Sequence, residues 1–241
     1  MAEWFEDWFD EDYALIYAHR DSAEACAAVD MALREAPELA RGPVLDLGCG
    51  AGRHLAALRH HNPAAFGLDL SRPLLGRAPE GLRPWLLQAD MRKLPVREGA
   101  LAGICLWFTP FGYFPDAENL ALLQDLGRRL RAGGILLLDY LNAERVLETL
   151  VHEDTLERAG IRVVSRRTLE DGRLVKRMTL LRLATGETRQ AMESVRLYRP
   201  ADVEQLALRA GLRLRRALGD YEGGPAVASS PRWIGVFERT V

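Results

Sequence analysis

The stretch VLDLGCGAGRH, Val44 to His54, places three glycines at alternating positions directly after a run of apolar and acidic residues. Glycine loses more conformational freedom on folding than other residues, so three of them within five positions need a structural reason. A glycine-rich turn between a strand and a helix brings backbone N–H groups and the helix N-terminus close to a ligand. The stretch therefore predicts a strand, a ligand-binding turn and a helix, in this order.

The spacing of the glycines distinguishes between two classes of cofactor. The dinucleotide fingerprint is G-x-G-x-x-G. Here the glycines are Gly48, Gly50 and Gly52, and Arg53 stands where that fingerprint has its third glycine. A carboxylate, Asp46, precedes the turn, and a carboxylate repels a pyrophosphate but attracts an ammonium group. The turn therefore favours a nucleoside that carries an amino acid over NAD or FAD.

Two further predicted strands also end in carboxylates. Asp69 ends the second strand, and an acidic side chain at that tip can accept hydrogen bonds from both hydroxyls of a ribose. Asp90 follows the third strand and can accept from the amino group of an adenine. Leu70 and Met91, next to these carboxylates, can enclose the ring of the base.

Strands and helices alternate through the first two thirds of the chain. Apolar runs predict strands at 43–47, 65–70, 86–89, 103–108 and 135–140, and helices at 22–40, 53–61 and 116–130. This alternation is typical of a mostly parallel, doubly wound sheet. After residue 160, three strands at 161–170, 173–184 and 187–198 are separated by Asp-Gly and Thr-Gly turns, which are hairpin signals. A helix at 200–210 and strands at 212–218 and 233–239 follow.

Four motifs in this order resemble the class I S-adenosylmethionine-dependent methyltransferases, over roughly residues 40–145: VLDLGCGAGRH, GLDLS, QADMRKLP and LRAGGILLLDYLN. The resemblance implies S-adenosylmethionine as cofactor, with Asp46, Gly48 and Gly50 beside its methionine part. It implies that Asp69 binds the ribose and that Asp90 and Met91 bind the adenine. The predicted cofactor-binding residues also include Cys49, Gly52, Leu70, Trp107 and Phe108. For Asp46, hydrogen bonding to loop amides alone is the alternative.

The resemblance also implies an architecture. We expect an α/β, Rossmann-like, doubly wound and mostly parallel seven-stranded sheet with an inserted three-stranded antiparallel lid. Residues 1–40 then form an N-terminal lid and helix, and 41–160 the core that binds S-adenosylmethionine. Residues 161–199 form the insertion over the active site, and 200–241 complete the sheet.

The segment after the fourth strand, LWFTPFGYF at 106–114, is rich in aromatic residues. Ligands of such sheets bind beyond the carboxyl ends of the strands, and aromatic faces attract a sulfonium. The segment lacks the N/D-P-P-Y/F signature and resembles the F-x-S-F/I-G-Y/H stretch of small-molecule methyltransferases, including N-methyltransferases of amino sugars. Phe111 and Tyr113 are predicted to contact the methyl acceptor. Alternatively, Phe111 and Phe114 pack against the next helix.

Other candidates for the acceptor site follow the last strands. Tyr140 and Asn142 end the fifth strand, Tyr198 ends the insertion, and Arg232 precedes the final strand. The candidates for catalytic residues are Tyr113, Asp139 and His54, although none is an unmistakable base. Because the cofactor's methyl group is already activated, we expect in-line transfer driven by positioning and exclusion of water.

The N-terminal segment carries Tyr13, Tyr17 and Arg20 ahead of the first long helix. In related small-molecule enzymes such a segment folds over the cofactor, which implies that these residues bind its methionyl carboxylate. The alternative is that the aromatic residues at positions 4–9 form an amphipathic turn or a contact with a partner.

Charge and composition limit the classes of partner that the protein is expected to bind. The chain has 241 residues and a net charge of −2, which gives no general reason to expect a polyanion. Between 161 and 199, however, nine arginines and one lysine face four acidic residues. This leaves open an RNA or protein methyltransferase that docks through the insertion, or a strand face balanced by the acidic N-terminus. A cofactor-binding protein without transfer activity is the third alternative.

The remaining features predict a cytoplasmic protein. The three cysteines have neither metal nor redox spacing, so we expect no metal. The acidic start is unlike a targeting peptide, and no apolar run is long enough to span a membrane. We expect a small-molecule acceptor, no membrane and no nucleic acid as partners, with a homodimer as a further possibility.

Overall fold

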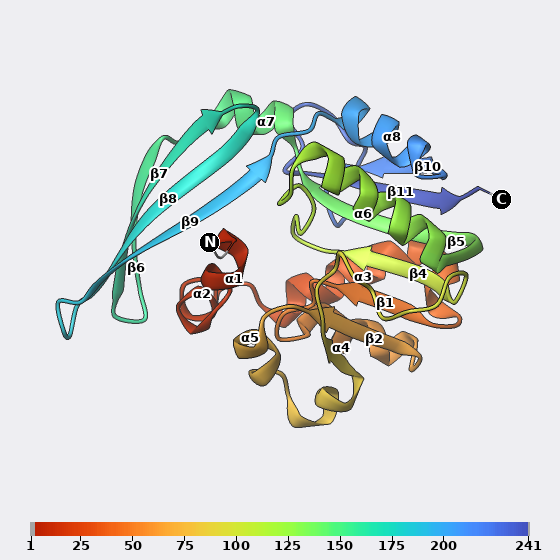
Figure 1. The fold of residues 1–241 in the computed structure, drawn as a ribbon, viewed down its shortest axis with the longest axis horizontal. Helices are drawn as coiled ribbons and strands as arrows, with labels where there is room; N and C mark the ends of the chain where they lie inside the picture. Colours follow the sequence, from red (N-terminus) through yellow and green to blue (C-terminus); the bar gives the residue numbers. More distant parts are fainter. Residues whose placement is uncertain (1–2, 241) are drawn as a thin grey trace.

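The computed structural model describes residues 3–240, which form two sheets with the N-terminal helices between them (Figure 1). Within these residues the larger sheet has seven strands, in the order β10-β11-β5-β4-β1-β2-β3. Its strands are β1 Val44–Leu47, β2 Ala65–Asp69, β3 Leu86–Gln88, β4 Leu101–Leu106, β5 Leu130–Leu141, β10 Leu212–Leu218 and β11 Arg232–Arg239. The first five are parallel, and β11 is antiparallel to both of its neighbours. The predicted doubly wound, mostly parallel sheet is confirmed.

Helices accompany this sheet. Their bounds are α1 Trp4–Trp8, α2 Glu11–Ile16, α3 Ser22–Glu35, α4 Arg53–His61, α5 Arg72–Gly76, α6 Asp116–Arg129, α7 Ala143–Thr149 and α8 Pro200–Arg209, with 3₁₀ turns at Pro37–Ala40 and Glu80–Trp85. The Asp21 side chain caps α3 by accepting from the Glu24 amide. The predicted helix 22–40 is interrupted because Pro37 disfavours helical backbone at Ala36, where α3 ends.

The fourth strand starts and ends two residues earlier than predicted, and its earlier end has a local cause. Phe108 and Thr109 have φ values of 60° and 66°, and this left-handed backbone cannot continue a strand beyond Leu106. Within β4, a Cβ on Gly103 would lie 2.2 Å from a methyl group of Leu39. Glycine at this position lets the 3₁₀ turn Pro37–Ala40 lie directly on the sheet.

The second sheet contains an additional strand. Among the described residues it has four strands, β6 Glu153–Arg158, β7 Ile161–Glu170, β8 Arg173–Arg182 and β9 Thr188–Arg196, where the sequence predicted three. The strand that was missed, β6, is an exposed edge strand with the polar sequence EDTLER. It is held by backbone pairing with β7 and by cross-strand ion pairs such as Arg166–Glu153 at 2.9 Å. Its sequence lacks the alternation of apolar and polar residues from which a strand is predicted.

Helices α1 and α2 lie between the two sheets, beside β9 (Figure 1). Trp8 and Ile16 are buried in one cluster with Met178 and Leu180 of β8. The indole N–H of Trp8 also donates to Glu193 at 2.7 Å. The predicted amphipathic N-terminal segment therefore buries its apolar side within its own chain. Among residues 3–240, no helix has the length and apolar character needed to traverse a bilayer.

Candidate functional site

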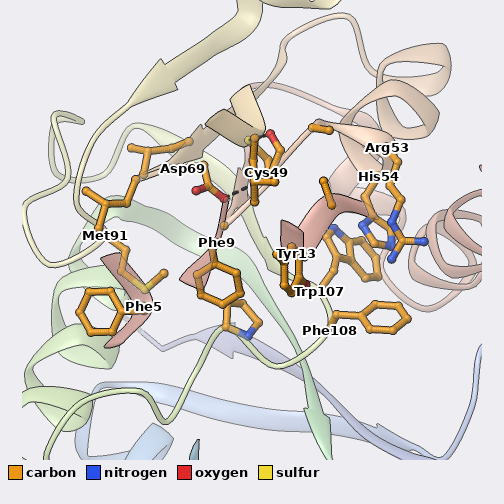
Figure 2. Close-up of a pocket in the computed structure, with 18 of the residues that line it drawn as sticks. Phe5, Phe9, Tyr13, Cys49, Arg53, His54, Asp69, Met91, Trp107 and Phe108 are labelled. Carbon is orange, nitrogen blue, oxygen red and sulfur yellow. Dashed lines mark hydrogen bonds between the residues drawn. The ribbon is translucent and has the colours of Figure 1, made fainter. Parts of the chain in front are cut away.

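A cavity of about 360 Å³ lies beyond the carboxyl ends of the central strands, in the size range of ligand sites. Its walls come from the glycine turn after β1, the tips of β2 and β3, the segment after β4 and the N-terminal helices. Figure 2 shows aromatic side chains on one side of the cavity and Asp69 and Cys49 on the other. The cavity therefore lies where the order of a parallel sheet reverses, between β1 and β4.

The glycine turn supplies backbone to this cavity. Gly48, Cys49 and Gly50 line it, and the two glycines have φ values of 76° and 56°. A Cβ on Gly48 would lie 3.1 Å from Pro110. Gly52 does not line the cavity; a Cβ there would lie 2.5 Å from Leu82. Gly52 therefore allows close packing at the start of α4 instead of contact with a ligand.

Two carboxylates stand at the tips of β1 and β2. Asp69 lines the cavity and accepts from the backbone amides of Gly50 at 2.8 Å and Ser71 at 2.7 Å (Figure 2). Asp46 is buried outside the lining, and one of its oxygens has no hydrogen-bond partner within residues 3–240. Burial and the nearby charge of Asp69 raise the pKa of Asp46 to about 7. Asp46 thus lies behind the glycine turn.

At the other end of the cavity, Leu70, Asp90 and Met91 are brought together as predicted from the sequence. Asp90 accepts from the Arg92 side chain at 2.8 Å, and although burial opposes it, this bonding lowers the pKa of Asp90. Phe5 also lines this end, beside Met91 (Figure 2). Phe5 was not predicted as a site residue, since its only signal in the sequence was the aromatic content of positions 4–9.

The N-terminal segment closes one wall. Tyr13, Tyr17 and Arg20 all line the cavity. The Arg20 guanidinium donates to the Tyr13 hydroxyl at 2.9 Å and lies 4.7 Å from the centre of the Phe108 ring. In the described part of the chain, Arg20 forms no ion pair with a carboxylate. It is therefore a cation at the cavity wall that is available to an anionic group.

A second aromatic wall follows β4. Trp107, Phe108 and Tyr113 line the cavity, and the ring of Phe9 stacks on Tyr113 at 5.9 Å. His54 stacks on Trp107 at 5.0 Å (Figure 2). Burial and the neighbouring arginines hold the pKa of His54 well below its usual range, while burial raises the pKa of Tyr113. Both side chains are therefore neutral near pH 7.

Three predicted acceptor residues lie in the core instead of the cavity lining. Tyr140 shares a face of β5 with Leu138, and it is packed together with Phe111 and Tyr198. The rings of Phe111 and Tyr198 stack at 5.7 Å, and the Tyr198 hydroxyl donates to Asp116 at 2.7 Å. Tyr140 and Tyr198 do not line the cavity with Tyr113, because both rings pack against Phe111 in the core.

Asp139, Asn142 and Arg232 lie behind the site. Asp139 is fully buried and accepts from the Phe108 amide at 2.9 Å, the Tyr221 hydroxyl at 2.7 Å and Arg232 at 2.6 Å. The Asn142 amide donates to backbone carbonyls of the loop before β11. None of the three lines the cavity. The role of Tyr221 was missed, since nothing in its sequence context indicates a contact with the fifth strand.

The arginines of the insertion are largely paired with carboxylates. Arg182 and Arg189 contact Asp12 of α2, and Arg189 also contacts Asp10. Others pair within the sheet, as Arg167 does with Asp154 at 3.0 Å. This arrangement matches one alternative raised from the sequence, in which the positive charges of the strand face are balanced by the acidic N-terminus.

Comparison with known proteins agrees with the fold. Residues 44–134 match a family model described as a methyltransferase domain. No curated protein matches the chain. The chain is similar to the solved structure of the CcbJ methyltransferase from Streptomyces caelestis, with a TM-score of 0.81 and 21% identity over 98% of this chain and 99% of that one.

Two other solved structures have a similar fold. The sugar N-methyltransferase KedS8 from Streptoalloteichus sp. gives a TM-score of 0.72 and 24% identity over 96% of this chain and 94% of that one. CalS10, an amino pentose methyltransferase from Micromonospora echinaspora solved with S-adenosylmethionine bound, gives 0.69 and 23% over 95% and 97%.

The seven-stranded fold, the cavity at the strand tips and the domain match together resemble those of S-adenosylmethionine-dependent methyltransferases. They support an enzyme that transfers a methyl group with S-adenosylmethionine as its cofactor.

Proposed function

We propose that the protein transfers the methyl group of S-adenosylmethionine to a nitrogen or oxygen of a small molecule, and that an amine nitrogen is the preferred acceptor. Two of the similar structures, KedS8 and CalS10, are named for methyl transfer to a sugar nitrogen and to an amino pentose. The cavity is enclosed by the N-terminal helices, which suits a small acceptor better than a polymer.

The preference for nitrogen rests on one observation: among the described residues, no side chain that lines the acceptor side of the cavity is a strong base. His54 is neutral and, because its pKa is lowered, binds a proton weakly. Tyr113 is held in its protonated form, and Asp139 is occupied by three donors outside the lining. A hydroxyl would need such a base to become a nucleophile, whereas a neutral amine needs only its lone pair.

The residues present fit the cofactor. The backbone at Gly48 and Gly50 approaches the cavity closely, and Asp69 is a carboxylate at the tip that suits ribose hydroxyls. We propose that Asp90 and Met91 contact the adenine and that Arg20, with Tyr13, binds the methionyl carboxylate. When bound, the cofactor supplies a methyl group on a positively charged sulfur.

The chain's own contribution is positioning and exclusion of water. Phe9 and Phe108 present aromatic side chains on the side of the cavity opposite Asp69, and Tyr113 also lines the cavity. Such faces stabilise a cationic group and keep water away from it. Holding the acceptor in line with the methyl group can lower the barrier by about 7–11 kcal/mol.

We propose the same four-part division as the sequence suggested, with one changed boundary. Residues up to 40 act as a lid, 41–152 as the cofactor-binding core and 200–241 as the completion of the sheet. The inserted lid starts at Glu153, where β6 begins, instead of at residue 161. The pairing of the insertion's arginines favours a role as a cover over docking of nucleic acid. A cytoplasmic location completes the proposal, supported by cysteines that are all free.

A direct test uses the wild-type protein and a matched pair of sugars. Calorimetry should first detect binding of S-adenosylmethionine. Formation of S-adenosylhomocysteine is then measured with D-glucosamine and with D-glucose, within a wider panel of small amines and their hydroxyl counterparts. We expect turnover in the amine series and little in the hydroxyl series. Turnover confined to hydroxyl compounds would overturn the preference for nitrogen, and lack of cofactor binding would overturn the whole proposal.

A further inference from the structure

A polar contact joins the cavity wall to the inserted sheet. The ring of Tyr17 lines the cavity, while its hydroxyl reaches two side chains of the insertion. Lys176 of β8 donates to this hydroxyl at 2.7 Å, and the hydroxyl donates to Glu193 of β9 at 3.1 Å. Lys176 and Glu193 are directly opposite each other in the β8–β9 pairing. No residue of the insertion lines the cavity itself among those described. Tyr17 connects the insertion to the site through side chains, and Arg173 of β8 does so through the backbone carbonyls of Tyr113 and Phe114.

The direction of these hydrogen bonds follows from the donors. The ammonium of Lys176 can only donate, so the Tyr17 oxygen must accept there and its own proton points to Glu193. A phenol oxygen has two acceptor positions, so one remains after Lys176 has donated. The indole N–H of Trp8 donates to the same oxygen of Glu193 at 2.7 Å and fixes the carboxylate. The hydroxyl of Tyr17, a residue of the cavity lining, can therefore accept one further hydrogen bond.

Charged groups surround this contact on every side. Arg20 and Tyr13 face it from the N-terminal segment, and the ring of His19 lies 6.1 Å from that of Tyr17. Arg167 of β7 and Asp154 of β6 face Lys176. Burial lowers the pKa of Lys176, whose side chain is 15% exposed and lies 3.9 Å from the Glu193 carboxylate. Glu193 is thus the carboxylate in contact with both Lys176 and Tyr17, and its side chain is 25% exposed to water.

We propose that Glu193 receives the proton of the acceptor amine through the Tyr17 hydroxyl. This inference rests on the proposed function. Simple amines resemble lysine, with a pKa of about 10, so near pH 7 most of the amine is protonated and has no lone pair. The ammonium gives a proton to the Tyr17 oxygen as Tyr17 passes its own proton to Glu193, and Glu193 then releases it to water.

The following step balances without another reactant. The freed lone pair of the amine nitrogen forms a bond to the methyl carbon as the bond from that carbon to the cofactor's sulfur breaks. The electron pair of the broken bond stays on the sulfur, which becomes a neutral thioether. Glu193 and Lys176 touch neither reactant, so both act as positioning residues through Tyr17.

The test compares Glu193→Gln and Tyr17→Phe with Glu187→Gln, using the amine that the wild type methylates best. Glutamine retains an oxygen that can accept from Trp8, while Glu187 is an exposed residue of the turn before β9. At pH 7 we expect kcat to fall by about 10²-fold in the first two variants, the lower end for proton transfer. As the pH rises toward 10, the amine loses its proton in solution, so both variants should approach the wild type. Glu187→Gln should follow the wild type at every pH.

Each outcome separates this inference from the proposed function. A loss of equal size at all pH values would show a merely structural role and overturn the inference, as would unchanged kcat in Glu193→Gln. Rescue by Glu193→Asp, which retains the carboxylate, is expected if the variant is tested at pH 7. Lack of turnover of any amine by a wild type that binds S-adenosylmethionine also overturns it. Lack of cofactor binding is a failure of the proposed function itself.

Discussion

The two halves of the cavity are built in different ways. The cofactor side uses Gly48 and Gly50 of the glycine turn, Asp69 at the end of β2 and Asp90 after β3, three places within one continuous stretch of the chain. The acceptor side combines the N-terminal helices with the segment after β4 and, through Tyr17, with β8 and β9. Backbone and strand register fix the first half, whereas the second depends on side chains that meet only after the chain has folded.

The polar contacts show the same difference. Asp69 is held by two backbone amides close to it in the sequence. Asp139 holds the Phe108–Thr109 turn of the acceptor side through Arg232 and Tyr221, which lie far along the chain. A strained turn that depends on distant partners is more vulnerable to substitution than one that its own strand supports.

The largest effect is expected from breaking this distant support. Asp139→Ala leaves the Arg232 guanidinium without its carboxylate, and removing one partner of a buried ion pair costs about 3–5 kcal/mol. Urea denaturation should show this loss in the free energy of unfolding. Asp139→Asn, which retains an oxygen for the Phe108 amide, should lose less. Equal losses in the two variants would mean that the charge of Asp139 is unimportant.

A smaller effect is expected on the cofactor side. Asp69→Ala removes the acceptor at the tip of β2 and should weaken binding of S-adenosylmethionine by about 1–3 kcal/mol, or roughly 5- to 150-fold. Calorimetry on the variant measures this directly. Asp30→Ala, an exposed position on α3, is the matched control and should bind as the wild type does. Unchanged affinity in Asp69→Ala would contradict the placement of the ribose.

The smallest effect concerns Asp46, behind the glycine turn. Its pKa of about 7 lies above the ordinary value of about 3.9, so the folded state binds this proton more tightly than the unfolded state. The stabilisation is complete below pH 4 and is lost as the pH rises to 7. Relative to Asp46→Asn, which does not titrate, the wild type should lose at most about 1.4 kcal/mol between pH 5 and 6. Denaturation at both pH values without cofactor measures this slope, and parallel curves would contradict the pKa.

The glycine turn illustrates what a short stretch can reveal. Its spacing favoured a nucleoside that carries an amino acid over a dinucleotide. Asp69 and Asp90 both line the cavity, because parallel strands end on one edge of the sheet. Asp46 and Gly52 were also predicted to bind the cofactor, but neither of them lines the cavity. The sequence does not show which side of the turn a residue faces, so packing against Leu82 was indistinguishable from contact with a ligand.

The acceptor side was predicted unevenly. Tyr13, Tyr17, Arg20 and Tyr113 line the cavity, whereas Phe111, Tyr140 and Tyr198 are core residues. Aromatic residues satisfy both environments, and only the side chain's direction in the folded chain separates them. The fourth strand of the insertion escaped prediction because cross-strand ion pairs, not apolar alternation, hold it in place.

The sequence by itself determined the class of enzyme and its cofactor. It also determined that carboxylates stand at the ends of successive central strands. These depend on local backbone geometry and on the fixed direction of parallel strands, both of which short motifs encode. The tertiary structure alone decided which aromatic residues line the cavity and that Tyr17 connects it to Glu193 and Lys176. Such contacts join residues more than 150 positions apart, and they are set by the packing of the N-terminal helices between the two sheets.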